Sequence, residues 1–183
     1  EIYREINIVF SNLDSYKNDL NNFFKNFISY YPKYKLPRII TLNSDIQYQN
    51  RVILTDSLLL IGLDNYLGSD HFFYSSMPVY IRENLDPSMI ISDIAEEYAH
   101  YVIPKNNYYT FLDKIIFYGK LLYFKDIMLP FEEDKNKIGY SNSNIDWAKK
   151  NEYYVWTYFV EKELIFSSEN ELTNRFINNT PFS

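Results

Sequence analysis

The chain has 183 residues, a formal net charge of −6 and a sequence pI of about 5.0. This length suits one domain, and a 46% share of hydrophobic residues excludes an intrinsically disordered chain. The acidic balance, with no run of Lys or Arg, argues against nucleic acid as a partner, and the absence of cysteine excludes disulfides, thiolate catalysis and cysteine-bound zinc.

The first half of the chain is predicted to contain four strands and one helix. Alternating apolar residues in "REINIVF" predict a strand near the N-terminus. The stretch "YKNDLNNFFKNFISYY" predicts a helix with one apolar face, which Pro32 ends. Three further strands are expected in "PRIITL", "DIQYQNRVIL" and "SLLLIGLD". The segment 64–86 is expected to be an ordered loop with short helical turns.

The second half is predicted to be helical. The stretch "DPSMIISDIAEEYAHYVI" has Asp86 at its cap and Pro87 in its first turn, the favoured order for a helix start. "YYTFLDKIIFYGKLLYFKDIML" is apolar nearly all round, which predicts a central buried helix. "SNSNIDWAKKNEYYVWTYFVEKELIF" predicts another helix, and a short one is expected over 170–178. The buried side of the long helix is expected to be Trp147, Val155, Trp156, Phe159 and Val160. This order of elements predicts the α+β class.

The stretch "DIAEEYAHYV" differs by one ligand from the H-E-x-x-H pattern of zinc proteases. At about 100° per residue, Asp93, Glu96, Glu97 and His100 form one polar stripe on a helix. One interpretation is a metal site, in which Glu96 and His100 bind an ion and Glu97 acts as general base. The other is the solvated polar face of an amphipathic helix. Spacing alone favours the solvated face, because zinc prefers imidazole to a Glu in the first ligand position.

Two further features of the sequence bear on binding: residues that could be additional metal ligands, and a group of tyrosines. With His71 as the only other histidine, a three-histidine site is impossible, and His71 or Asp113 would have to supply a further ligand. A third interpretation is a module that binds peptide or glycan through clustered tyrosines, although packing at the edge of the core is the favoured role for these rings. The tyrosines concerned are Tyr30, Tyr31, Tyr34, Tyr153 and Tyr154.

Several long stretches in a fixed order resemble the gliding-motility lipoprotein GldB family of Bacteroidota. They are "DIAEEYAHYVIP", "LDKIIFYGKLLYFKDIMLP", "KIGYSNSNIDWAKKNEYYVWTYFVEKELIFSS" and "RFINNTPFS". The stretch "LLLIGLDNYLGSDHFFYSSMPVYIRENLDPSMI" is similar to the family's middle segment, so the resemblance covers roughly 58–183. It implies a lipoprotein of the outer membrane, on its periplasmic or surface side, that serves gliding and type IX secretion through contacts with other proteins of that machinery. The chain 1–183 is then expected to be one domain that lacks the signal peptide, the lipidated N-terminus and a C-terminal part.

The same resemblance implies an architecture related to the H-E-x-x-H zinc metallopeptidases: a small, mainly antiparallel sheet packed against several helices. Carried over by position, Glu96 and His100 occupy the first two zinc-ligand positions, Glu97 that of the general base and Tyr118 that of the third ligand. Glu96 and Tyr118 depart from the pattern. The resemblance therefore predicts a non-catalytic protein without a cofactor on a degenerate, zincin-like scaffold. The alternative is an active zinc metallopeptidase with an atypical Glu/His site.

Overall fold

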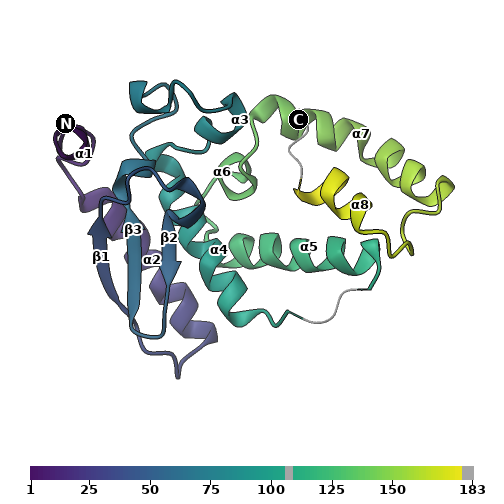
Figure 1. Cartoon of the computed structure of the whole chain (residues 1–183). Helices are drawn as coiled ribbons and strands as arrows, with labels where there is room; N and C mark the ends of the chain where they lie inside the picture. Colours follow the sequence, from purple (N-terminus) through teal and green to yellow (C-terminus); the bar gives the residue numbers. More distant parts are fainter. Residues whose placement is uncertain (106–108, 179–183) are drawn as a thin grey trace.

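The computed structural model describes residues 1–105 and 109–178 and confirms the α+β class (Figure 1). Tyr108, at the start of a predicted helical stretch, and the last residues of "RFINNTPFS" lie outside the described residues. The helices are α1 (Ile2–Val9), α2 (Asp14–Tyr30), α3 (Val79–Arg82), α4 (Ile90–Val102), α5 (Phe111–Met128), α6 (Asp134–Ile138), α7 (Asn142–Glu161) and α8 (Asn170–Thr173), which continues into the π turn η5 (Asn174–Asn178). The 3-10 turns are η1 (Tyr48–Asn50), η2 (Leu63–Asn65), η3 (Phe72–Tyr74) and η4 (Pro87–Met89).

The sheet is mixed, so the prediction of a mainly antiparallel sheet is wrong. Its strands are β1 (Arg38–Leu42), β2 (Val52–Leu54) and β3 (Leu58–Gly62), in the spatial order β1-β3-β2. A tight turn joins β2 to β3 as an antiparallel pair, whereas the connection 43–51 first carries the chain from β1 to the far edge. The next strand, β3, therefore lies at the centre of the sheet and runs in the same direction as β1. The two strands pair in parallel from Arg38↔Leu58 to Leu42↔Gly62.

A buried carboxylate holds the connection between β1 and β2 in place. Asp64 follows β3 and is fully buried; it accepts hydrogen bonds from the backbone N–H groups of Ser44 (2.8 Å) and Ile46 (2.5 Å). Asp45 and Ile46 have positive φ values of 55° and 59°, an unfavourable conformation for a β-branched residue such as isoleucine. The hydrogen bonds to this carboxylate stabilise the strained conformation, and so they fix the path of the chain that leads to Arg51 and β2.

The N-terminal segment is the helix α1, so the strand predicted there is wrong. Ile2, Ile6 and Val9 are four and three residues apart, which is helical spacing, and all three pack into or against the core. Ile8, which the alternating pattern placed on the buried face, is exposed. Seven residues are compatible with both periods, and the contact of α1 with η2 selects the helix.

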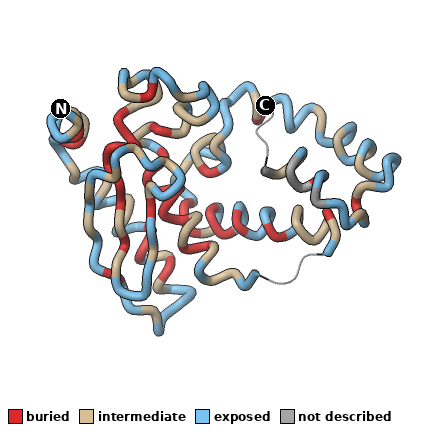
Figure 2. The backbone as a smooth tube through the Cα atoms, viewed as in Figure 1, coloured by how far each residue is buried: buried red, intermediate tan, exposed pale blue. Residues whose placement is uncertain are grey.

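One further burial prediction is wrong and another is wrong in part, and both concern the helices of the second half. The helix α5 is buried on one face only, since Ile116, Leu122 and Tyr123 on its other side are exposed. On the predicted buried side of α7, Val155 and Phe159 are partly buried, whereas Trp147, Trp156 and Val160 are exposed. Figure 2 shows this contrast between the largely exposed α7 and the buried centre of the molecule, where α4 lies. Both helices are apolar around much of their circumference, so their sequences do not define the buried side.

The core is built around α4, which contacts α2, α5 and β2. The ring of Tyr98 on α4 packs edge-on against Phe23 and Phe27 of α2, at centroid distances of 5.1 and 4.8 Å. The helix predicted before Pro32 is confirmed: α2 ends at Tyr30 and buries its apolar face. Across the described ranges, no helix combines the length and apolar character that crossing a membrane requires.

Candidate functional site

The helix α4 carries the E-E-x-x-H stretch and begins as its sequence predicts. The carboxylate of Asp86 caps η4 by accepting the N–H of Ser88 (3.0 Å), and Pro87 occupies the first turn. The chain then continues directly into α4, where Ile94 and Tyr98 are fully buried on the apolar side. The start of the helix thus sets which direction the polar stripe faces.

The polar stripe of α4 is only partly solvated, so its interpretation as a solvated face is wrong for Asp93. Asp93 is 7% exposed, whereas Glu96, Glu97 and His100 are partly buried. Arg51, just before β2, and Lys125 of α5 contact the stripe. Burial of carboxylates requires compensating partners, which the structure provides for two of the three.

Asp93 is held by a bidentate ion pair with Arg51, the residue before β2. The guanidinium donates from Nε to Oδ2 (2.5 Å) and from Nη2 to Oδ1 (2.7 Å), and the hydroxyl of Tyr66 donates to Oδ2 (2.7 Å). Burial raises the pKa of Tyr66 well above its usual value, and the charge of Asp93 raises it further. Tyr66 therefore stays protonated and acts as a hydrogen-bond donor, so this triad joins β2, α4 and the loop after η2.

Glu96 is paired with Lys125 of α5 at 2.6 Å. The ammonium group is buried and also donates to the backbone carbonyl of Lys137 (2.9 Å). Burial tends to raise the pKa of Glu96, but the charge and hydrogen bond of Lys125 outweigh it and the pKa is lowered. Glu96 is thus an ionised carboxylate whose neutralising cation belongs to the protein itself.

Within the part of the chain that the structure describes, Glu97 and His100 are the two members of the stripe without such a partner. Burial raises the pKa of Glu97, and the neighbouring carboxylates of Glu96 and Asp93 raise it further. Burial lowers the pKa of His100, and among the described residues its buried Nδ1 has no hydrogen-bond partner. An imidazole held neutral near a carboxyl group with a raised pKa is the feature of this stripe that most resembles a catalytic site.

Replacing Glu97 with glutamine is expected to raise the free energy of unfolding by about 0.5 kcal/mol at pH 7, because Asp93 and Glu97 are like charges four residues apart on one helix. The folded state raises the pKa of Glu97, so it favours the protonated form. Protonated Glu97 therefore stabilises the folded state fully below about pH 4.3, the ordinary pKa of a glutamate in the unfolded chain. This stabilisation is lost as the pH rises through the higher pKa that Glu97 has in the folded state. The gain from glutamine should therefore vanish near pH 4. Urea denaturation at pH 4 and pH 7 measures both values, and an equal gain at the two pH values would contradict the prediction.

The two additional ligands considered from the sequence are engaged elsewhere. His71 caps η3, where its Nδ1 accepts the N–H of Phe73 (3.3 Å), and its Nε2 lies 3.6 Å from Glu5 of α1. Asp113 forms a capping box with Thr110 at the start of α5. Within residues 1–105 and 109–178, no group of three His, Cys, Asp or Glu side chains is arranged to hold a metal ion. The donors in this part of the chain therefore do not fit a three-ligand zinc site.

Tyr118 lies on α5, on the same stripe as Lys125 and two turns before it. Its side chain is 40% exposed, and its ring packs edge-on against Phe117 at 5.5 Å. The ring of Phe117 in turn lies 5.9 Å from His100. These contacts place Tyr118 on the helix that faces α4, and its assignment to the third ligand position stays a prediction.

The clustered tyrosines divide into two kinds. Tyr31 and Tyr34 pack on Phe27, at centroid distances of 4.7 and 4.9 Å, which is the expected role at the edge of the core. Tyr30, Tyr153 and Tyr154 are exposed, and Tyr31 is exposed at 36% although its ring packs on Phe27. Of the five rings, Tyr34 is therefore the one with the least claim to a ligand surface.

Sequence reasoning missed the three residues that neutralise or bind the stripe: Arg51, Tyr66 and Lys125. A weak signal existed for Lys125, since it is a cation within the otherwise apolar run "KLLYFKDIML". No signal marked Arg51 or Tyr66, because their partner lies 42 and 27 residues away in the chain.

Comparison with known proteins gives one finding. A family model described as "Gliding motility protein GldB" matches residues 1–183. No match was found among curated proteins or among solved structures. The match covers the whole chain, including the N-terminal part where the resemblance of the sequence is weakest.

Proposed function

The chain belongs to the GldB family of gliding motility lipoproteins, and from this premise we propose that it is a non-catalytic component of the motility machinery that acts through contacts with other proteins. The proposal includes a lipid anchor in the outer membrane and a contribution to type IX secretion. Family membership supports involvement in gliding and partners within that machinery. The absence of catalysis rests on the geometry of α4.

One observation carries the non-catalytic part: the cation beside Glu96 is Lys125. Oε2 of Glu96 lies 2.6 Å from this ammonium group, which is buried. A metal ion at the same carboxylate would either be repelled by that fixed positive charge or break the ion pair, which costs several kcal/mol. With Tyr118 in the third ligand position, the remaining donors offer too little affinity to do so.

The zincin-like scaffold is part of the same proposal. It is supported by the arrangement in which α4, the helix with the E-E-x-x-H stretch, packs against the edge strand β2 and against α5. Under this proposal Glu96, His100 and Tyr118 correspond to zinc ligands, while Lys125 and Arg51 supply the positive charge. The family would then retain the scaffold of a peptidase for its shape.

A specific observation favours the alternative, an active zinc peptidase. Glu97 has a raised pKa and His100 has a buried Nδ1 without a partner in the described part of the chain, as a general base and a metal ligand would before zinc binds. Two donors on one helix are one fewer than the protein ligands of catalytic zinc sites. We therefore place this function second.

The experiment is to test gliding and metal content in parallel. Glu97→Gln and His100→Ala are introduced into the gene of a gliding strain, with Glu152→Gln on the exposed side of α7 as a charge-matched control. We expect all three strains to glide and to secrete normally, and the purified protein to contain no stoichiometric zinc. Loss of gliding in Glu97→Gln with the fold intact, or about one zinc per chain that His100→Ala removes, would overturn the proposal in favour of the peptidase.

A further inference from the structure

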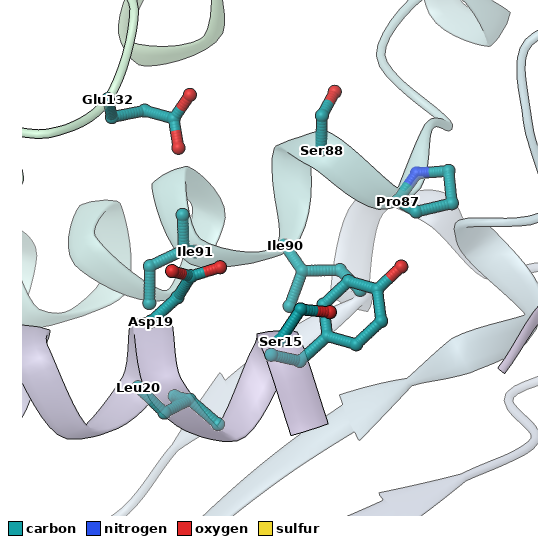
Figure 3. Close-up of a pocket in the computed structure, with 9 residues that line it drawn as sticks. Ser15, Asp19, Leu20, Pro87, Ser88, Ile90, Ile91 and Glu132 are labelled. Carbon is teal, nitrogen blue, oxygen red and sulfur yellow. The ribbon is translucent and has the colours of Figure 1, made fainter. Parts of the chain in front are cut away.

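A cleft of about 300 Å³ lies between the first half of α2 and the start of α4 (Figure 3). None of the residues that line it belongs to the polar stripe. Its volume is at the lower end of the range for binding pockets, which suits a single side chain more than a large ligand. The lining residues are Ser15, Tyr16, Asp19, Leu20, Pro87, Ser88, Ile90, Ile91 and Glu132.

Two carboxylates from distant parts of the chain meet at this cleft. Asp19 projects from α2, and Glu132 projects from the segment after α5 on the other side of the space (Figure 3). In the described residues neither carboxylate forms an ion pair with Lys, Arg or His. By contrast, the neighbouring acids Asp14 and Glu133 each pair with a lysine, at 3.2 and 2.9 Å. Oε1 of Glu132 accepts hydrogen bonds from Asn136 Nδ2 (2.7 Å) and from the N–H of Glu133 (3.2 Å), and neither donor is charged. Within the described residues, the cleft therefore has two negative charges without an internal cation.

Two groups that line the cleft have raised pKa values. Burial raises the pKa of Asp19, and the charge of Glu132 raises it further. Burial also raises the pKa of Tyr16, with additional contributions from Asp86 and Asp19. Carboxyl groups with perturbed pKa values in a cleft are candidates for a functional site.

The cleft also has an apolar lining. In the view of Figure 3, Leu20 from α2 lies below Asp19, and Ile91 from α4 lies between Asp19 and Glu132 with Ile90 to one side. A cationic side chain of a protein has the matching composition, because arginine and lysine carry a charged end on an apolar stem of three or four methylene groups. A metal ion would not use the apolar lining, and an apolar ligand would leave the charges of both carboxylates without a counter-ion.

We propose that this cleft receives the side chain of an arginine or lysine from a partner protein, with its stem on Leu20, Ile90 and Ile91 and its charged end between Asp19 and Glu132. This inference rests on the proposed function, since it names the partner chemistry for one of the contacts. Arginine fits better than lysine, because a planar guanidinium donates to two carboxylates at once. The net charge of −6 favours the approach of a basic partner.

The test uses nuclear magnetic resonance of the ¹⁵N-labelled chain with N-acetyl-arginine amide as the probe. N-acetyl-citrulline amide has nearly the same shape without the charge and serves as the matched ligand. We expect saturable shifts of the Leu20, Ser88 and Ile91 amides with the arginine probe, and at least tenfold weaker binding of the citrulline probe. Equal binding of both probes, or tighter binding of spermidine than of arginine, would overturn the inference.

Matched variants separate the cleft from general charge. Asp19→Asn/Glu132→Gln removes both carboxylates and keeps their shape, whereas Asp14→Asn/Glu133→Gln removes the same charge just outside the cleft. The first pair should abolish the arginine-dependent shifts and the second should retain them, with well-dispersed spectra showing that both variants fold. Equal effects of the two pairs would contradict a specific site.

The same two variants in a gliding strain distinguish this inference from the proposed function. We expect the cleft variant to lose gliding and the control variant to keep it. If the cleft variant glides normally, the cleft has no role in the machinery, although the proposed function stands. If instead Glu97→Gln abolishes gliding, the proposed function fails whatever the cleft binds.

Discussion

Replacing Asp93 with alanine is expected to lower the free energy of unfolding by about 3–5 kcal/mol, the usual loss when one partner of a buried ion pair is removed. Asp93 is 7% exposed and accepts three hydrogen bonds, two from Arg51 and one from Tyr66. Without it, the guanidinium is left partly buried beside a fully buried hydroxyl, and neither regains water. Urea denaturation followed by circular dichroism measures the loss as a lower midpoint with an unchanged slope.

Three variants show whether this loss comes from the buried triad. Asp146→Ala removes an exposed carboxylate of α7 and should change stability by less than about 0.5 kcal/mol. Tyr66→Phe should cost about 1 kcal/mol, because the ion pair survives it. Arg51→Met/Asp93→Leu should recover part of the stability lost in Asp93→Ala, since it replaces both charges with apolar groups. A loss below about 1 kcal/mol for Asp93→Ala would show that the triad is more hydrated than its geometry indicates.

The sequence predicts the fold well where a capping residue and a hydrophobic period agree. Asp86 and Pro87 mark the start of the segment that contains α4, and Pro32 marks the end of α2. Prediction fails where the period is short or absent. Seven residues near the N-terminus suit a strand or a helix, and α5 and α7 have apolar side chains around much of their circumference. For these elements, tertiary contacts decide the outcome.

In the site, too, the sequence predicts what depends on neighbouring residues and does not predict what depends on distant ones. The sequence places Asp93, Glu96, Glu97 and His100 on one stripe, because their spacing is a local property of a helix. It does not predict that Asp93 is buried and that Glu96 is paired, because Arg51 and Lys125 come from distant segments of the chain. Whether a stripe of carboxylates is solvated, binds metal or is neutralised internally depends on those distant residues.

Replacing Lys125 with methionine is the second change with a large expected effect, a loss of about 2–3 kcal/mol. The substitution keeps the apolar stem but removes the ammonium group that binds Glu96 and the carbonyl of Lys137. The expected loss is smaller than for Asp93, because the side chain of Glu96 is 47% exposed and its freed carboxylate regains water. Glu96→Gln/Lys125→Met should lose less than the sum of the single variants, by about 1 kcal/mol in a double-mutant cycle.

Adding zinc to the Lys125→Met protein then tests whether the polar stripe of α4 can still bind a metal ion. With the internal cation gone, Glu96 and His100 are free to bind an ion if their geometry is still suitable. Zinc at one hundred times its Kd would add about 2.7 kcal/mol and restore most of the lost stability. We expect no such gain, because the proposed function leaves two zinc donors on one helix, one fewer than a catalytic zinc site uses. A zinc-dependent rise in the unfolding midpoint, absent from Lys125→Met/His100→Ala, would instead mean that Lys125 alone keeps a competent metal site closed.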